Sequence, residues 1–177
     1  MAEAKGTPIY RHQMADYLNT AASGAATADY HLMNVMETMD ESPSAQTSDK
    51  HYTGDVAGTT LTTGYKPQFA LSGDLYKDNA VMEFLRDIGE EQKVGVQADY
   101  VRVRLYQPIT AKENTFYARK FTVSPEVSSI SGAGGEIVSI EGNLNVVGDV
   151  VIGEFNTATK TFKSAAEVAA ETVNSGG

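Results

Sequence analysis

A stretch of strict alternation in the middle of the chain points to a β-sheet protein. Residues 98–107 place Val101, Val103 and Leu105 on one face, and Tyr100, Arg102, Arg104 and Tyr106 on the other. A period of two with β-branched and aromatic residues is typical of a strand, and Pro108 ends it. Residues 115–123 repeat the pattern after a short polar linker, so we expect the two strands to form an antiparallel hairpin.

Further strands and a helix follow from similar patterns. Residues 135–144 and 146–155 predict a second strand pair, and residues 30–36 and 66–71 predict two more strands. Elsewhere, one helix face carries Val81, Phe84, Leu85 and Ile88 at the spacing of buried positions. Asp78 is a suitable N-cap and Gly89 a suitable end, which bounds this helix at about 78–88. An alanine-rich segment, 165–172, predicts a second helix with little to bury.

Polar segments divide the chain into a central domain and extensions. We expect an N-terminal arm at 1–28, a β domain at 29–162 with a long polar loop at about 37–63, and a C-terminal arm at 163–177. Polar loops of this length are uncommon inside compact domains unless they bind something. Either these segments are disordered, or they become ordered against neighbouring copies of the chain.

The charge of the chain is acidic and unevenly distributed. The 177 residues include 23 acidic and 14 basic side chains, a net charge of −9. Residues 1–60 and 126–177 each carry −5, whereas residues 61–125 carry +1. Such a chain is expected to bind DNA weakly, because the affinity of a protein for DNA comes mainly from Lys and Arg side chains. Complementary zones would allow copies to pack together, although random surface composition explains the distribution equally well.

Composition also excludes several kinds of chemistry and location. The chain has no cysteine, which excludes disulfides, thiolate catalysis and cysteine-based zinc sites. The first residues do not lead into the apolar segment of a secretory signal, and no run approaches the roughly 20 apolar residues of a membrane span. We therefore expect synthesis in the cytoplasm and no membrane partner.

No motif predicts an enzyme. The three histidines lack metal-binding spacing, and the glycine-rich segment 131–135 lacks the Gly-Lys-Ser/Thr ending of a phosphate-binding loop. Paired acidic residues lie where solvated surface is expected, and no Gly-x-Ser-x-Gly elbow is present. We therefore predict no catalytic residue, no metal and no cofactor.

The face that carries Arg102 and Arg104 between two tyrosines has a superficial similarity to a stacking sheet for single-stranded nucleic acid. Only two further basic residues, Arg119 and Lys120, would reinforce it in an acidic chain. We therefore expect this face to pair across strands or to form an interface to an acidic neighbour, in preference to binding nucleic acid.

Seven short strings occur in a series that resembles the major tail tube proteins of long-tailed, siphovirus-type bacteriophages and prophages of Gram-positive hosts. The strings are GYKPQF at 64–69, GDLYKD at 73–78, ARKF at 118–121, GGE at 134–136, GNL at 142–144, GEF at 153–155 and TKTF at 159–162. Their order matches from the first strand to about Phe162, which is most of the chain. They hold turn and packing residues, not a catalytic signature. Residues 163–177 match no motif of this family.

The resemblance implies a mainly β fold, a two-sheet β-sandwich or half-barrel with one flanking α-helix. It implies a non-enzymatic, late-expressed virion protein whose copies self-assemble into homohexameric rings, joining their sheets into a β-barrel around a channel. Rings would stack through both arms and the long loop, and genome DNA would be ejected through the channel without specific binding. Further implied partners are the tape measure protein, the tail terminator and distal tail or baseplate proteins. The implied location is the virion tail, after synthesis in the host cytoplasm.

Candidate functional residues in such a tube act through charge and contact. A neutral or acidic wall would repel the genome and keep it sliding. Candidate wall acids are Glu136, Glu141, Asp149 and Glu154. The alternative is that these are ordinary outward-facing polar positions. Candidate contacts between subunits are Tyr10, Tyr17, Tyr52, Arg102, Arg104 and Phe162.

Two other functions stay open at this point. An inner tube of a contractile tail or secretion-type injection apparatus shares the fold, and a sheath-binding outer surface would distinguish it. A β-sandwich module that binds a receptor or carbohydrate would expose aromatic residues in a groove. The chain has no Trp and only 8% aromatic residues, which disfavours such a module.

Overall fold

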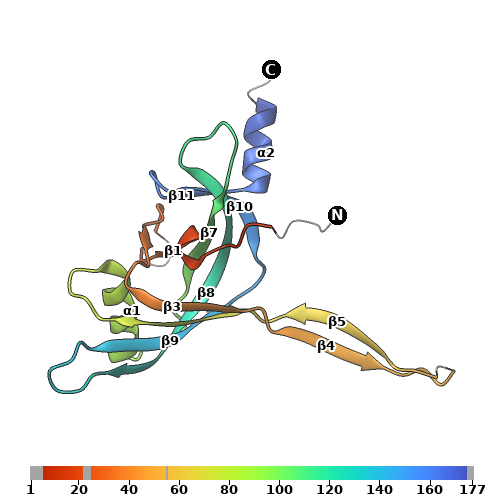
Figure 1. Ribbon diagram of the computed structural model, residues 1–177, viewed down its shortest axis with the longest axis horizontal. Helices are drawn as coiled ribbons and strands as arrows, with labels where there is room; N and C mark the ends of the chain where they lie inside the picture. The colour runs from red at the N-terminus through yellow and green to blue at the C-terminus, as the bar shows by residue number, and fades with distance from the viewer. Residues whose placement is uncertain (1–5, 22–24, 55, 175–177) are drawn as a thin grey trace. The chain divides into compact units, whose positions relative to one another are not determined.

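The computed structural model describes residues 6–21, 25–54 and 56–174, and it is mainly β, as predicted (Figure 1). The chain divides into two compact units. Unit 1 comprises residues 1–34, 97–122 and 148–177, and unit 2 comprises residues 35–96 and 123–147. The long strand β8 (Thr115–Ser131) therefore contributes its first part to unit 1 and its second part to unit 2.

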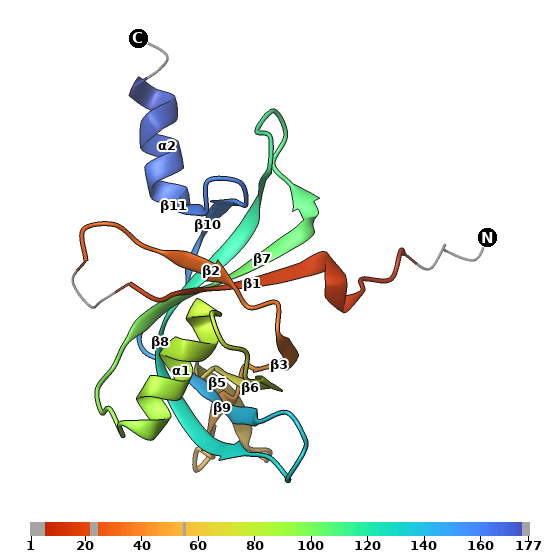
Figure 2. The same cartoon turned by 90° about the vertical axis from the view of Figure 1, so that its left-hand side faces the viewer.

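Unit 1 is built around β7 (Ala98–Pro108), the strand with the clearest alternation. β1 (Met14–Asn19) pairs antiparallel with β7 and with β2 (Tyr30–Leu32). On the other side, β8 neighbours β7, as predicted, and β10 (Val151–Asn156) pairs antiparallel with β8 and with β11 (Thr161–Ser164). A 3-10 turn, η1 (Arg11–Gln13), precedes β1, and the helix α2 (Ala165–Asn174) follows β11 (Figure 2).

The core of unit 1 confirms that the valine face of β7 is buried. Val101 and Val103 pack with Tyr17, Tyr30 and Phe155, and with Ala118 of β8. The Phe155 ring lies 4.6 Å from the Tyr17 ring and meets the Tyr30 ring edge-on at 5.6 Å. Aromatic pairs in these geometries add stability beyond the area that they bury.

Unit 2 holds an antiparallel sheet and the helix α1 (Ala80–Glu90). β6 (Gln68–Asp74) pairs with β3 (Met36–Ser42) and with β9 (Ser139–Val146), and β9 also pairs with the second part of β8. The buried residues of unit 2 come from these strands and from one face of α1. The large hydrophobic side chains among them are Met39, Phe69, Leu71, Val81, Met82, Leu85, Ile88, Val123, Ile140 and Leu144.

The ends of α1 differ from the prediction. The N-cap is Asn79, whose Oδ1 accepts a hydrogen bond from the Met82 amide at 3.1 Å, whereas Asp78 has a positive φ of 63° just before the helix. Gly89 lies inside the helix and does not end it. A Cβ at this position would come within 2.8 Å of the Val127 side chain, so the glycine allows helix and strand to approach closely.

The predicted second strand pair is wrong. β9 and β10 do not pair with each other, because each pairs with a different part of β8. The prediction ended the second strand at residue 123, but β8 continues to Ser131 through Pro125. A strand of 17 residues offers enough edge for both partners.

The stretch 37–63, predicted as a long loop, contains most of β3 and a hairpin of β4 (Ala45–Lys50) and β5 (Thr59–Tyr65). The hairpin extends away from the rest of unit 2 (Figure 1). Nearly all of its residues are exposed on both faces. A two-stranded hairpin with no buried face is only marginally stable in water. Its alternation was invisible in the sequence because neither face is apolar.

The predicted arms contain ordered elements as well. The N-terminal arm, 1–28, includes η1 and β1, and the C-terminal arm, 163–177, includes α2. Residues 1–5, 22–24 and 175–177 of these arms lie outside the described residues. The division into two arms and a domain stays a prediction. Among the described residues, no helix has the length and apolar character needed to cross a membrane.

Candidate assembly surfaces

A buried charge cluster lies between β1 and β7. The antiparallel register places Asp16 directly opposite Arg102. Asp16 accepts hydrogen bonds from Arg102 Nε at 2.8 Å and from the Tyr100 hydroxyl at 2.5 Å, and its second oxygen accepts one from Arg11 of η1. Burial, and then the charge of Asp16, raise the pKa of Tyr100 well above its ordinary value. The polar face of β7 is therefore partly buried within its own chain.

The turn before β1 presents an aromatic ring in a defined orientation. The Tyr10 backbone amide donates to Gln13 Oε1 at 2.8 Å, and the Gln13 amide donates to the Tyr10 carbonyl at 3.0 Å. The Tyr10 ring stacks on His12 with centroids 5.7 Å apart. Tyr10 and the adjacent Ile9 are nevertheless 58% and 57% exposed. The turn therefore holds two apolar side chains toward solvent.

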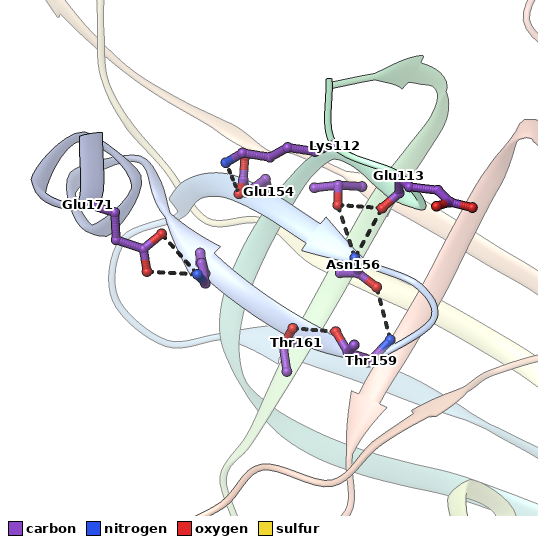
Figure 3. Close-up of a pocket in the computed structure, with 9 residues that line it drawn as sticks. Lys112, Glu113, Glu154, Asn156, Thr159, Thr161 and Glu171 are labelled. Atoms are coloured by element: carbon purple, nitrogen blue, oxygen red, sulfur yellow. Dashed lines mark hydrogen bonds and ion pairs between the residues drawn. The ribbon is translucent and has the colours of Figure 1, made fainter. Parts of the chain in front are cut away.

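A polar cavity of about 360 Å³ lies near the start of α2 (Figure 3). Lys112 Nζ lies 2.5 Å from Glu154 Oε1, and Lys163 Nζ lies 2.7 Å from Glu171 Oε1. Asn156 donates to the Glu113 carbonyl at 3.2 Å. Both lysines are paired with carboxylates, so the cavity is poorly suited to bind an anion. Its bonds instead connect the β7–β8 loop, β10, β11 and α2.

Helix α2 is attached to β11 through its first turn. The Ser164 amide and hydroxyl donate to Glu167 Oε2 at 2.7 and 2.8 Å, and the Glu167 amide donates back to Ser164 Oγ at 3.3 Å. This is the reciprocal arrangement of a capping box. The backbone hydrogen bond from Ser164 lowers the pKa of Glu167. Beyond this cap and the Lys163–Glu171 ion pair, the helix buries little, since its described side chains are exposed except for the half-buried Val168.

The four candidate wall acids lie in different settings. Glu136 lies in the β8–β9 loop and Glu141 on β9, both exposed in unit 2. Asp149 is exposed just before β10 in unit 1. Glu154 is buried on β10 and paired with Lys112. Glu154 therefore contributes little charge to the surface.

The six candidate contact residues also differ in exposure. Tyr10 and Tyr52 are exposed, the latter at the end of the β4–β5 hairpin. Arg104 is half-buried, with its guanidinium 4.7 Å from the centre of the Tyr117 ring. The remaining three, Tyr17, Arg102 and Phe162, pack within unit 1. Their role between subunits stays a prediction.

Sequence reasoning missed the groups that organise unit 1. Asp16 was not singled out, since its partner Arg102 lies 86 residues away and only the strand register brings them together. The ion pairs of Lys112 with Glu154 and of Lys163 with Glu171 were missed as well, although the second pair is only eight residues apart in the sequence. No group of three or more His, Asp or Glu side chains suited to a metal ion occurs among the described residues.

Comparisons with known proteins find similarity in structure only. No family model and no curated protein matches the chain. The tail of an empty gene transfer agent particle, refined with C6 symmetry, aligns with a TM-score of 0.57 at 13% identity over 82% of this chain and 98% of that one.

Two further structures align in the same way. The SPP1 tail tube has a TM-score of 0.57 at 14% identity over 80% of this chain and 77% of that one. The sheath/tube terminator of an extracellular contractile injection system has a TM-score of 0.52 at 12% identity, over 84% of this chain and 99% of that one. At these identities the likeness concerns the fold. The chain thus has the mainly β fold found in phage tail tubes.

Proposed function

We propose that this chain is the structural subunit of a bacteriophage tail tube, assembling as stacked rings around a channel through which the genome is ejected. The observation that carries the proposal is the fold, which aligns over about four fifths of the chain with the SPP1 tail tube and with a gene transfer agent tail. The role is structural, which agrees with the lack of any catalytic or metal-binding motif in the sequence.

Exposed elements with no core of their own support assembly. The β4–β5 hairpin buries almost nothing within the chain, and α2 exposes most of its surface. Marginal elements of this kind gain stability when a neighbouring subunit covers them. We propose that the hairpin, the N-terminal arm and the C-terminal arm make the contacts between rings, with Tyr10 and Tyr52 as contact residues.

Six subunits per ring are the proposed stoichiometry, by analogy with the C6 symmetry of the gene transfer agent tail. We further propose that the tube belongs to a siphovirus-type phage or prophage of a Gram-positive host. In the virion tail, the tube would meet the tape measure protein, the tail terminator and distal tail or baseplate proteins. These partners follow from the family resemblance of the sequence.

The wall of the channel would be acidic or neutral. We propose Glu136, Glu141 and Asp149 as wall residues, because their carboxylates are exposed, whereas Glu154 is paired with Lys112. A net charge of −9 per subunit adds repulsion toward a polyanion. DNA would therefore slide through without binding.

Negative-stain electron microscopy of the purified chain at rising concentration tests the proposal. We expect rings or tubes of uniform width that become more abundant with concentration. A chain that stays monomeric at every concentration, including millimolar, would contradict the proposed function.

An inner tube of a contractile injection apparatus is a second candidate, favoured by the alignment with the tube terminator of such a system. Purification of native particles from the source organism would distinguish the two. A sheath surrounding the tube would favour the second candidate, and a bare tube would favour the first.

A further inference from the structure

We propose that α2 is a lid on unit 1, which opens and unwinds as a separate unit while the strands beneath it stay folded. Opening uncovers an apolar strip formed by Ile109, Tyr117 and Ile152, which lie under the helix in one groove. The inference does not depend on the proposed tube function, because it concerns contacts within unit 1 of a single chain.

The apolar contact between α2 and the strip is small. Val168 is half-buried, whereas the other described side chains of the helix are exposed. Val168 lines the groove together with Ala165 and Ala169, which stand beside it at helical spacing. The groove keeps an open volume of about 320 Å³, since the alanine side chains end at Cβ. Burial of one valine therefore supplies most of the apolar attachment.

Two more hollows border the same helix. One of about 470 Å³ reaches Ser164 and Glu167, and another of about 360 Å³ reaches Glu171 (Figure 3). Each of the three hollows meets different residues of α2. Protein interiors are close-packed, with few voids larger than a water molecule. A helix with open space along three parts of its surface therefore lacks the packing of a core helix such as α1.

Polar contacts supply the rest of the attachment. The capping box joins Ser164 to Glu167, and Lys163 Nζ lies 2.7 and 2.9 Å from the two carboxylate oxygens of Glu171. Lys120 of β8 lines the same hollow as Glu167, and its charge attracts that carboxylate. The Lys163 and Glu171 side chains are 46% and 58% exposed, so salt screens their attraction. The attachment of the lid therefore weakens as ionic strength rises.

The helix is too short to persist once it has detached. It has 10 residues, and isolated helices shorter than about 12–15 residues are marginal in water. It follows β11 directly, because Ser164 ends the strand and also caps the helix. Detachment therefore unwinds α2, whereas β11 stays paired with β10. Local opening of such an element needs less free energy than unfolding of the whole chain.

Hydrogen exchange of the dilute full-length chain, resolved by NMR or by mass spectrometry of peptides, tests the lid. We expect the α2 amides to exchange at least about 100-fold faster than the β7 amides, but more slowly than in an unstructured peptide. Equal protection of α2 and β7 would overturn the proposal, because α2 would then open only when unit 1 unfolds. A complete lack of protection in α2 would overturn it too, because the lid would never close.

Two leucine variants test where the lid docks. Ala169→Leu adds a side chain within the groove, whereas Ala170→Leu adds the same side chain outside the groove lining, on an exposed position of α2. Both variants make the same change in helix propensity. We expect Ala169→Leu to slow α2 exchange by about fivefold or more, because the leucine is buried only when the lid is closed. Ala170→Leu should change it by less than about twofold. An equal effect of the two variants would contradict docking on the apolar strip.

Salt dependence tests the contribution of charge to closing the lid. Raising NaCl from about 0.02 M to about 0.5 M should speed α2 exchange by about twofold or more, and by more than it changes β7 exchange. Glu171→Gln should open faster at low salt and respond less to added salt, since it lacks the ion pair with Lys163. An α2 that is insensitive to salt, or a full salt response in Glu171→Gln, would contradict this attachment.

Discussion

Replacing Asp16 by asparagine removes the counter-charge of a buried guanidinium. The side chains of Asp16 and Arg102 are only 3% and 5% exposed, and their charged atoms lie 2.8 Å apart. Breaking a buried pair by removing one partner costs about 3–5 kcal/mol, because the remaining charge is left in the interior. Arg11 adds little to this cost, since it is 55% exposed and water can solvate it.

Urea unfolding at pH 7, followed by circular dichroism, measures this effect. With a slope of about 2 kcal/mol per molar, Asp16→Asn should lower the midpoint by about 1.5–2.5 M. The exposed Asp29, which contacts only His31 among the ion pairs described, provides the control. Asp29→Asn should change the free energy of unfolding by no more than about 0.5 kcal/mol.

A double variant separates the charge effect from the loss of hydrogen bonds. Adding Arg102→Met to Asp16→Asn removes the buried guanidinium that has lost Asp16 and should restore stability by at least about 1 kcal/mol, because apolar replacements of buried pairs are often neutral. A stability of Asp16→Asn within about 1 kcal/mol of the wild type would contradict this role of the buried pair. A double variant that is less stable than Asp16→Asn would contradict it as well.

Three further predictions concern pH, packing and assembly. Because the pKa of Tyr100 is raised in the folded state, the free energy of unfolding should fall as pH rises above about 10, by up to about 1.4 kcal/mol per pH unit for this group. Urea midpoints measured between pH 9 and 11.5 should therefore fall less steeply in Tyr100→Phe than in the wild type, and equal slopes would contradict the role given to Tyr100. Gly153→Ala should lower the free energy of unfolding by about 1–3 kcal/mol, because the alanine Cβ would collide with the Lys163 carbonyl. An unchanged melting temperature in thermal unfolding would refute this collision. Replacing residues 45–65 by a short glycine linker should change the free energy of unfolding by less than about 1 kcal/mol yet prevent tube formation. Tubes of this variant in electron micrographs would show that the hairpin is dispensable.

Local patterns were sufficient to predict the elements that have one apolar face. The valine face of β7 and the apolar face of α1 are visible at a period of two and at helical spacing, and both are buried as expected. The β4–β5 hairpin was not visible, since both of its faces are polar and exposed. The length of β8 was underestimated because proline normally interrupts a strand.

The pairing of distant residues could not be predicted from local patterns. Whether Arg102 faces a neighbour or the interior depends on Asp16 across the β1–β7 register, and no short-range signal encodes that register. Likewise, Glu154 looks like a surface acid in the sequence, and only the β7–β8 loop brings Lys112 to it. Glu154, whose partner is distant in the sequence, was therefore the hardest of the candidate wall acids to assign.

Cryo-electron microscopy of tubes assembled from the pure chain tests the tail tube function most directly. We expect stacked six-fold rings with an open channel wide enough for duplex DNA, and carboxylates of Glu136, Glu141 and Asp149 on its wall. Solid filaments without a channel, or no ordered assembly at all, would contradict a tail tube.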